Sequence, residues 1–279
     1  MKTLGYYNGK IAELEEMTVP MLDRACYFGD GVYDVAVCRN YRTFALEEHL
    51  DRFINSSKLI RITPDHTKEE LTELVASLLA KMDSGDQMVY LQYSRGSALR
   101  NHTFAPDIRP NLWVMIKPLV MKEDPKPLRC MTMEDTRFLH CNIKTINLIP
   151  SVLASQAAEE QGLDECILHR GNEVTECAHS NVSILKGGVL YTHPTDNLIL
   201  PGIARAHLIR ACNELGIKVR EIPFTLDELF GADEILVTST TKLLCPVVEL
   251  DGKKVGGKDP KNLTALRSYV WEEYVEETE

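Results

Sequence analysis

The spacing of apolar residues predicts amphipathic helices along the chain. Within residues 44–60, apolar side chains recur three or four positions apart, at Leu46, Leu50, Phe53 and Ile54. This period is typical of a helix with one buried face. Residues 67–82 repeat the pattern. Pro150 and Gly162 are the expected ends of a third helix, because proline suits the first helical turn and glycine the position after the last. Two more helices are expected at 205–215 and 263–275.

Alternating or continuous apolar stretches predict strands between these helices. Asn8-Gly9 is a typical hairpin turn between two short strands. A glycine-containing loop that starts at Asp23 leads into a strand that ends near Val37. Further strands are expected at residues 88–95, 112–117, 128–133, 165–169, 173–185 and 234–237. The mixture indicates an α/β (α+β) protein.

A change in composition indicates where one domain ends and the next begins. The segment M-K-E-D-P-K-P-L, residues 121–128, is rich in proline and charge, as linkers are. A chain of 279 residues is long enough for two domains. We therefore predict a small N-terminal α/β domain, residues 1–119, and a larger C-terminal domain, residues 120–279.

The charge of the chain limits its partners. The formal net charge is −10, which argues against nucleic acid or an anionic membrane as the main partner, because phosphate binding needs a basic surface. We expect neither a signal peptide nor a membrane span. The eight cysteines are scattered without C-x-x-C pairs. They are interpreted as reduced cytoplasmic thiols, and no metal site is predicted.

A lysine among apolar residues is the first candidate for chemistry. Lys144 lies between Ile143 and Ile146 in the stretch R-F-L-H-C-N-I-K-T-I-N-L-I-P-S, Arg137 to Ser151. Desolvation lowers the pKa of a lysine, and a neutral amine is the nucleophile that Schiff-base chemistry needs. The alternative is a lysine whose stem is buried and whose ammonium stays in water. Lys144 by itself favours that alternative.

Other polar groups suit an anionic ligand. Arg52 lies on a predicted helix, and Arg100 and His102 stand two residues apart in a loop, where they suit a carboxylate. Glu176 ends the motif E-V-T-E and is a partner for a buried base. Each of these side chains has an ordinary explanation as a solvated surface charge.

Two turns suit a phosphate group. The motif L-P-G-I-A-R begins a predicted helix, whose free amides at Gly202, Ile203 and Ala204 favour an anion. The motif T-S-T-T follows a predicted strand and supplies the hydroxyls of Ser239 and Thr240. A turn of this composition is common, so neither motif identifies a ligand alone.

Together these motifs resemble the fold-type IV pyridoxal-phosphate aminotransferases, which include D-amino-acid aminotransferases, branched-chain aminotransferases and aminodeoxychorismate lyase. The resemblance runs through almost the whole chain, from F-G-D-G-V-Y and E-H-L-D-R-F through N-I-K-T-I-N, E-V-T-E, S-N-V and Y-T-H-P to T-S-T-T. It implies a β-barrel-like core in the larger domain and a cofactor in the cleft between the domains. The R-x-H pair at Arg100 and His102, with Tyr33, is similar to the D-amino-acid aminotransferases.

The resemblance implies a role for each candidate residue. Lys144 would form the Schiff base with pyridoxal 5′-phosphate and move the proton, and Glu176 would keep the pyridine nitrogen protonated. Tyr33, Arg100 and His102 would hold the substrate carboxylate. The remaining contacts to the cofactor would come from Arg52, Leu200, Ile203, Ala204, Ser239 and Thr240.

The expected activity is transamination between a D-amino acid, such as D-alanine, and a 2-oxo acid, such as 2-oxoglutarate, by a cytoplasmic homodimer. Branched-chain aminotransferase and aminodeoxychorismate lyase remain alternatives, as does a binding protein for a small anion without chemistry. Three positions depart from the family pattern: Ala204 stands in place of threonine, Cys177-Ala178-His179 in place of a Gly/Ser-rich run, and Asp34 in place of glutamate. These departures concern cofactor affinity and substrate range.

Overall fold

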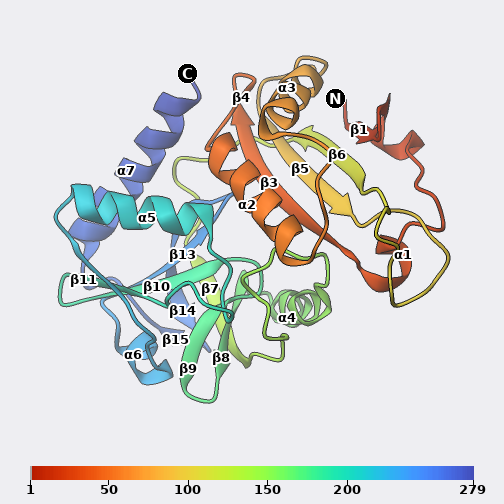
Figure 1. The fold of residues 1–279 in the computed structure, drawn as a ribbon. Coiled ribbons are helices and arrows are strands. Elements are labelled where there is room, and N and C mark those ends of the chain that lie inside the picture. The colour runs from red at the N-terminus through yellow and green to blue at the C-terminus, as the bar shows by residue number, and fades with distance from the viewer. Residues whose placement is uncertain (1) are drawn as a thin grey trace. The chain divides into compact units, whose positions relative to one another are not determined.

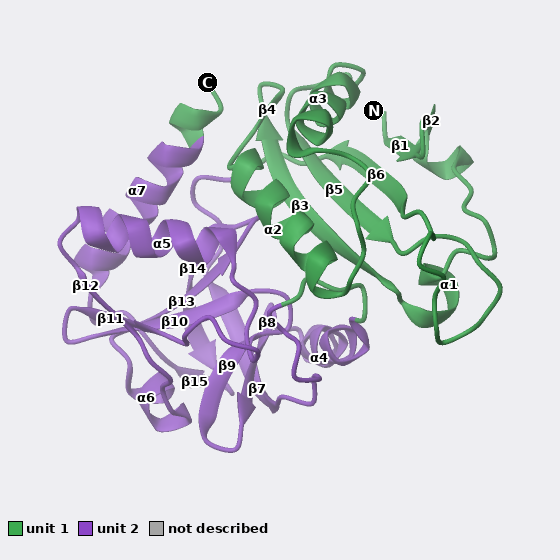
Figure 2. Cartoon of the chain, viewed as in Figure 1, with its two compact units in different colours: residues 1–121, 143–147, 275–279 green, residues 122–142, 148–274 purple. Residues whose placement is uncertain are grey.

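The computed structural model describes residues 2–279, which form two compact units (Figures 1 and 2). Unit 1 comprises the chain up to Met121 together with Ile143–Asn147 and Val275–Glu279. Unit 2 comprises Lys122–Asn142 and Leu148–Tyr274. This division differs from the expected domains 1–119 and 120–279, because a short segment around Lys144 and the last residues of the chain belong to unit 1.

Unit 1 is built on a six-stranded sheet in which all neighbours are antiparallel. The strand order is β2-β1-β6-β5-β3-β4. The bounds are β1 Leu4–Tyr7, β2 Lys10–Ala12, β3 Gly31–Arg39, β4 Arg42–Thr43, β5 Gln87–Ser94 and β6 Asn111–Pro118. The predicted Asn8-Gly9 hairpin is confirmed, with positive φ at both residues (44° and 91°), as a tight turn of this type requires.

Helices α2 (Leu46–Leu59) and α3 (Lys68–Leu79) cover one face of this sheet (Figure 1). Both were expected from the apolar spacing. Thr67 caps α3, accepting a hydrogen bond from Glu70 N at 3.2 Å, while the Glu70 side chain accepts from Thr67 N at 2.7 Å. Cross-strand register brings apolar side chains into rows under the helices, among them Val32, Tyr93 and Leu112. The unit also contains the short helices η1 (Leu14–Glu16) and α1 (Ala25–Phe28).

Unit 2 is built on a nine-stranded mixed sheet. The order is β12-β11-β10-β13-β14-β7-β8-β9, with β15 paired to β14. Strand β9 also contacts β10, so the sheet curls into the barrel-like core that was expected. The bounds are β7 Leu128–Glu134, β8 Glu165–Arg170, β9 Glu173–Cys177, β10 Asn181–Lys186, β11 Val189–Thr192, β12 Lys218–Glu221, β13 Glu234–Ser239, β14 Leu243–Leu250 and β15 Lys253–Lys254.

The prediction of one continuous strand over residues 173–185 was wrong. The chain forms two strands, β9 and β10, because it turns at residues 178–180, where Cys177 N donates to Ser180 O at 2.7 Å. The apolar residues on both sides of the turn gave no sign of this break. The turn brings the end of β9, with Glu176, close to Asn181 at the start of β10, since the two side chains are hydrogen-bonded.

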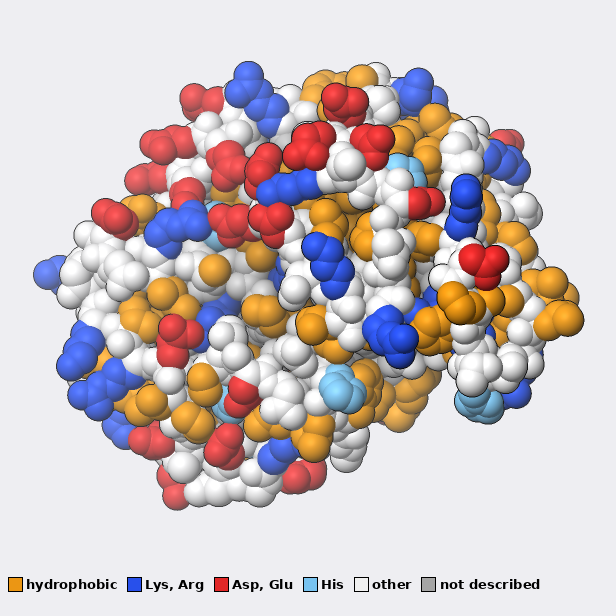
Figure 3. Space-filling view, viewed as in Figure 1, with side chains coloured by type: hydrophobic (Ala, Val, Ile, Leu, Met, Phe, Trp, Pro, Cys, Tyr) orange, Lys and Arg blue, Asp and Glu red, His pale blue; other side chains and the backbone are white. Residues whose placement is uncertain are grey.

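The helices of unit 2 largely follow the predicted ranges. They are α4 Ile149–Glu160, α5 Ile203–Glu214, α6 Leu226–Gly231 and α7 Pro260–Glu277, whose last residues belong to unit 1. Helix α6 was not predicted because its six residues are too few to show a period. Acidic side chains gather near the C-terminal end of α7 on the face in Figure 3, in line with the negative net charge. Among residues 2–279, no helix combines the length and hydrophobicity needed to span a bilayer.

Candidate active site

The short segment that carries Lys144, residues 143–147, is held against the first residues of strand β3 in unit 1. Tyr33 N donates to Lys144 O at 2.9 Å, and Ile146 N donates to Gly31 O at 3.1 Å. Lys144 N donates to Ser56 Oγ of α2 at 3.3 Å. The Lys144 Nζ atom lies 4.4 Å from the centroid of the Tyr33 ring. The backbone of the lysine is therefore fixed on two sides, and its amine lies on an aromatic face.

Arg52 is half of a buried ion pair in unit 1. Its Nε and Nη2 atoms donate to the two oxygens of Asp34 at 2.8 and 2.7 Å, and His49 Nδ1 lies 2.8 Å from Asp34 Oδ1. The Asp34 side chain is fully buried. Burial alone would raise the pKa of Asp34, but Arg52 and His49 outweigh it and hold the pKa below its usual value. Burial lowers the pKa of His49. The planar fork of Arg52 is thus oriented in advance.

Arg100 and His102 lie on an exposed loop of unit 1. Both side chains lie against Phe28: the Arg100 guanidinium carbon is 5.0 Å from the ring centroid and the His102 ring 5.2 Å. Arg24 donates to the carbonyls of Asn101 and His102 at 2.6 and 3.3 Å. The structure therefore brings Arg100 and His102 to one aromatic ring and joins Lys144 to Tyr33, without a recorded contact between the two pairs among residues 2–279.

Glu176 is a buried carboxylate in unit 2. Its Oε2 atom accepts hydrogen bonds from Asn181 Nδ2 at 2.8 Å and from Leu200 N at 3.0 Å. Its Oε1 atom accepts a hydrogen bond from Arg137 Nη1. Side-chain exposure is 7% for Glu176 and 10% for Arg137. A cationic partner favours the charged form of a buried carboxylate, and a charged carboxylate is the partner that a protonated base needs.

The turn before α5 is packed closely against Asn181. Gly202 is the N-cap of α5, so the amides of Ile203 and Ala204 lie in its first turn, as predicted. A Cβ on Gly202 would lie 1.9 Å from Asn181 Oδ1, so any larger residue here would displace the Asn181 side chain. Asn181 Nδ2 also donates to Leu200 O at 3.0 Å. One asparagine therefore links Glu176, the Leu200 segment and the N-terminus of α5.

Ser239 and Thr240 lie at the same end of the sheet as this turn. Asn181, the first residue of β10, pairs with Thr238 near the end of β13. The Thr238 hydroxyl is buried and has no hydrogen-bond partner within residues 2–279. Ser239 and Thr240 are half-buried. Helix amides and hydroxyls therefore share one edge of unit 2, and this donor set suits a phosphate group.

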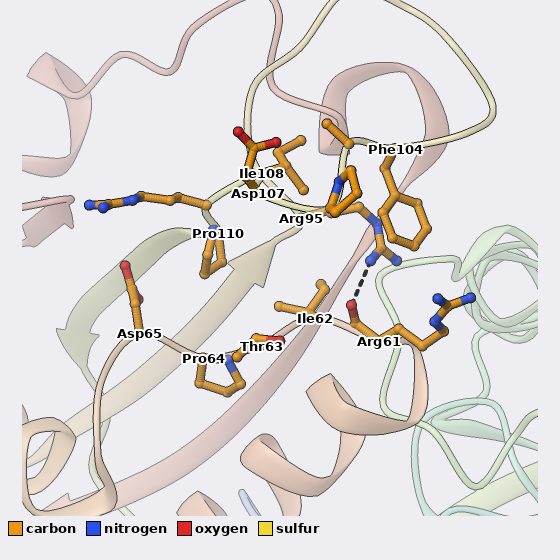
Figure 4. Close-up of a pocket in the computed structure, with 13 residues that line it drawn as sticks. Arg61, Ile62, Thr63, Pro64, Asp65, Arg95, Phe104, Asp107, Ile108 and Pro110 are labelled. Atoms are coloured by element: carbon orange, nitrogen blue, oxygen red, sulfur yellow. Dashed lines mark hydrogen bonds between the residues drawn. The ribbon is translucent and has the colours of Figure 1, made fainter.

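Unit 1 also contains a cavity of about 570 Å³ that none of the predicted residues line (Figure 4). Two loops form it, residues 61–65 and 104–110, together with Arg95. Arg95 donates to Arg61 O at 3.0 Å and lies 3.9 Å from the Phe104 ring centroid. The Arg61 guanidinium carbon lies 5.6 Å from the same ring centroid, so both guanidinium groups lie against Phe104 (Figure 4).

No group of three or more His, Cys, Asp or Glu side chains that suits a metal ion occurs in the described part of the chain. The candidate groups are instead an amine and an oriented guanidinium in unit 1, and a paired carboxylate and a helix N-terminus in unit 2. By its chemistry, each group suits one part of a cofactor with an aldehyde, a basic ring nitrogen and a phosphate.

Comparison with known proteins identifies the family. The family model for amino-transferase class IV matches residues 31–250. The chain belongs to the class IV aminotransferases. Within this family it is 42% identical to D-alanine aminotransferase of Listeria monocytogenes, over 95% of this chain and 94% of the relative. It is 36% identical to D-alanine aminotransferase of Staphylococcus haemolyticus, over 97% of both chains.

Solved aminotransferase structures share the fold. The branched-chain amino acid aminotransferase of Escherichia coli superposes with a TM-score of 0.91 at 23% identity, over 100% of this chain and 96% of that one. The branched-chain aminotransferase of the archaeon Thermoproteus uzoniensis, solved with norvaline, gives a TM-score of 0.88 at 23% identity, over 99% and 97%. The fold-type IV architecture expected from the motifs is confirmed.

The sequence did not reveal several residues that organise these groups. Asp34 was expected only to be a departure from the family pattern, and His49 was only one letter of the motif E-H-L-D-R-F, yet both orient Arg52. Arg137 stands at the start of the lysine stretch, and Asn181 lies in the quoted motif S-N-V. Their roles depend on contacts with residues far along the chain, which spacing does not show.

Proposed function

We propose that this class IV aminotransferase uses pyridoxal 5′-phosphate to move an amino group between a D-amino acid, such as D-alanine, and a 2-oxo acid, such as 2-oxoglutarate. Near full-length similarity to D-alanine aminotransferases supports the D-amino acid. The observation that carries the proposal is the Lys144 amine, held on the ring of Tyr33 by a fixed backbone.

When bound, pyridoxal phosphate supplies a carbonyl that bonds to amines and a ring that withdraws electrons from the substrate Cα. Lys144 is the amine that would hold it covalently and, once released, move the proton from Cα. Glu176 would accept the hydrogen bond of the protonated ring nitrogen. Hydrogen bonds from Asn181 and Leu200 hold its carboxylate in place for this role.

The phosphate would be held by charge and by dipoles. Arg52 supplies a guanidinium already oriented by Asp34, and the amides of Ile203 and Ala204 supply a helix N-terminus. Ser239 and Thr240 add hydroxyls at the same edge of unit 2 as those amides. Ala204 has no hydroxyl where the family usually has one, so the buried charge of Arg52 carries more of the binding.

Leu200 and the substrate residues complete the assignment. Leu200, whose amide is fixed by Glu176, would pack on the cofactor ring. Tyr33, Arg100 and His102 would bind the α-carboxylate of the substrate, since arginine grips a carboxylate with two parallel hydrogen bonds. The Arg100 guanidinium makes no ion pair within residues 2–279, which keeps its donors available.

The cytoplasm and a homodimer are part of the proposal. All eight cysteines are free thiols, which suits a reducing compartment. Helix α4 exposes apolar side chains at Ile149, Val152 and Leu153, 70%, 56% and 63% exposed, and these support association with a second copy. Light scattering on the purified protein tests the dimer, because a monomer mass at micromolar concentration would reject it.

Turnover assays test the activity against its alternatives. Purified protein with pyridoxal phosphate should form pyruvate from D-alanine and 2-oxoglutarate, and far less from L-alanine. A preference for L-leucine would instead indicate a branched-chain aminotransferase. Product release from aminodeoxychorismate without an amino acceptor would indicate the lyase. A protein that shows no absorption of lysine-bound cofactor after unbound cofactor has been removed would be a binding module.

A further inference from the structure

Arg137 in unit 2 is not among the residues assigned so far, yet its guanidinium is a cationic partner of Glu176. Its Nε and Nη2 atoms donate to Asp135 at 3.0 and 2.9 Å, and Nη2 also donates to Leu198 O at 3.0 Å. The guanidinium is therefore fixed on one edge and presents Nη1 to Glu176.

Asp135 is the anchor of this arrangement. Its side chain is fully buried and accepts hydrogen bonds from Arg137 N at 2.9 Å, Arg170 Nε at 3.2 Å and Thr175 Oγ1 at 3.1 Å. Burial by itself would raise the pKa of Asp135, but Arg137 holds it below its usual value. Two carboxylates, Asp135 and Glu176, are thus balanced by two guanidinium groups, Arg137 and Arg170.

We propose that Arg137 is a positioning residue that keeps Glu176 ionised and oriented for the ring nitrogen of the cofactor. The inference rests on the proposed function. A neutral Glu176 could not hold a protonated nitrogen, and a buried carboxylate without a cation takes up a proton more readily. Arg137 therefore acts on the cofactor through the charge of Glu176, without contacting it.

The groups around Glu176 allow its protonation to be followed by changing the pH. Arg137, Cys141 and Cys177 act electrostatically on Glu176, while Asp135 and Arg170 lie on the other side of the Arg137 guanidinium. Burial raises the pKa of Cys141 to about 11 and that of Cys177 well above its usual value. Both thiols stay neutral between pH 6 and 9, so they add no step in that range. The phosphate and the ring nitrogen of the probe titrate there with wild type and variant alike, so a step that appears only after loss of Arg137 would come from Glu176.

The test measures binding of pyridoxamine 5′-phosphate to the apoprotein by calorimetry between pH 6 and 9. This probe cannot bond covalently to Lys144, so it reports the pocket rather than turnover. At pH 6.5, Arg137→Met should raise the dissociation constant about as much as Glu176→Gln does. The expected increase is about tenfold for each unit by which the loss of Arg137 raises the pKa of Glu176. The affinity of Arg137→Met should recover toward wild type as the pH rises to 9. Arg137→Lys should restore most of the loss.

Three further variants keep the test decisive. Asp135→Asn/Arg137→Met removes one charge of each sign, so it should fold where the single variant leaves two buried carboxylates. The triple variant that adds Glu176→Gln to this double variant should lose no more affinity than Glu176→Gln alone. Arg129→Met is the matched control, because Arg129 pairs with Glu249 at 3.0 Å in the same sheet, and binding should be unchanged.

The outcomes separate the inference from the proposed function. If wild-type protein does not bind pyridoxamine phosphate, the proposed function fails. If wild type binds but the Arg137 variants bind equally well at every pH, the inference is wrong and the function stands. If the losses of affinity caused by the Arg137 and Glu176 substitutions add in the combined variant and do not depend on pH, the role of Arg137 is merely structural and the inference is wrong.

Discussion

Two arginines of unit 1 show opposite ways of presenting a positive charge. Arg52 is 8% exposed and is gripped by the fully buried Asp34. Arg100 is exposed on a loop and lies against Phe28 without an ion pair in the described chain. The first is oriented before any ligand arrives, which suits a group that stays bound. The second keeps its donors available, which suits a substrate that enters and leaves at every turnover.

Lys144 combines features of both regions and should give the largest effect. Its backbone is fixed like the buried pair, while its half-buried amine lies on Tyr33. Lys144→Ala should keep the fold and the melting temperature within a few degrees, but lower kcat by more than the roughly 10²–10⁴-fold that positioned proton transfer alone supplies. Steady-state assays with D-alanine measure this. Near-normal turnover without added amine would remove Lys144 from the mechanism.

Asp34→Ala should destabilise the protein by removing the buried ion pair with Arg52. It removes the carboxylate partner of the buried Arg52, and loss of one partner of a buried ion pair typically costs about 3–5 kcal/mol of unfolding free energy. Denaturant titration at pH 7 measures the loss. Because the pKa of Asp34 is held below its usual value, its contribution is complete above about pH 4 and is lost as the pH falls toward the depressed value. A variant with unchanged stability would mean that water already screens the pair.

Arg100→Ala should affect catalysis and leave stability alone. Charge-assisted hydrogen bonds are worth roughly 1.5–3 kcal/mol each, so kcat/KM should fall about tenfold to a few hundredfold for all D-amino acids alike. Arg100→Lys should restore only part, since lysine lacks the planar fork. Melting curves should coincide with wild type. A loss confined to D-glutamate and D-aspartate would place Arg100 at the substrate side chain instead.

Glu277→Ala should give the smallest effect. Its Oε1 atom accepts a hydrogen bond at 2.7 Å from Ala45 N, the N-cap residue of α2, the helix that carries Arg52. Loss of a cap costs about 0.5–2 kcal/mol, with exposed caps at the low end. Chemical denaturation should detect this shift, while kcat stays within twofold. A large fall in cofactor affinity would show that the C-terminal residues position Arg52.

The sequence predicted the elements with a clear period and the groups with a recognisable motif. Helix α2 followed from Leu46, Leu50 and Phe53, and the barrel-like core of unit 2 followed from the family resemblance. Lys144 could not be assigned to unit 1 in advance, because its place depends on hydrogen bonds to Tyr33 and Gly31, more than a hundred residues earlier.

The sequence pattern did not predict the ion-pair partners of the charged candidate residues. Asp34 and Arg52 come from a strand and a helix, and Arg137 and Glu176 are 39 residues apart. A charged residue in an apolar setting shows that a partner is needed, because an unpaired buried charge is costly, but it does not name the partner. The turn that divides β9 from β10 was missed for a different reason, since Ala178, His179 and Ser180 include neither glycine nor proline, the usual signs of a turn.

The central claim is that this chain transfers the amino group of a D-amino acid to the bound cofactor. A single half-reaction tests it most directly, with pyridoxal phosphate-loaded protein mixed in turn with D-alanine and L-alanine and no 2-oxo acid. We predict that D-alanine removes the visible absorption of the lysine-bound cofactor and releases about one pyruvate per active site, and that 2-oxoglutarate restores the absorption. An unchanged spectrum with D-alanine, or an equal response to L-alanine, would contradict the account.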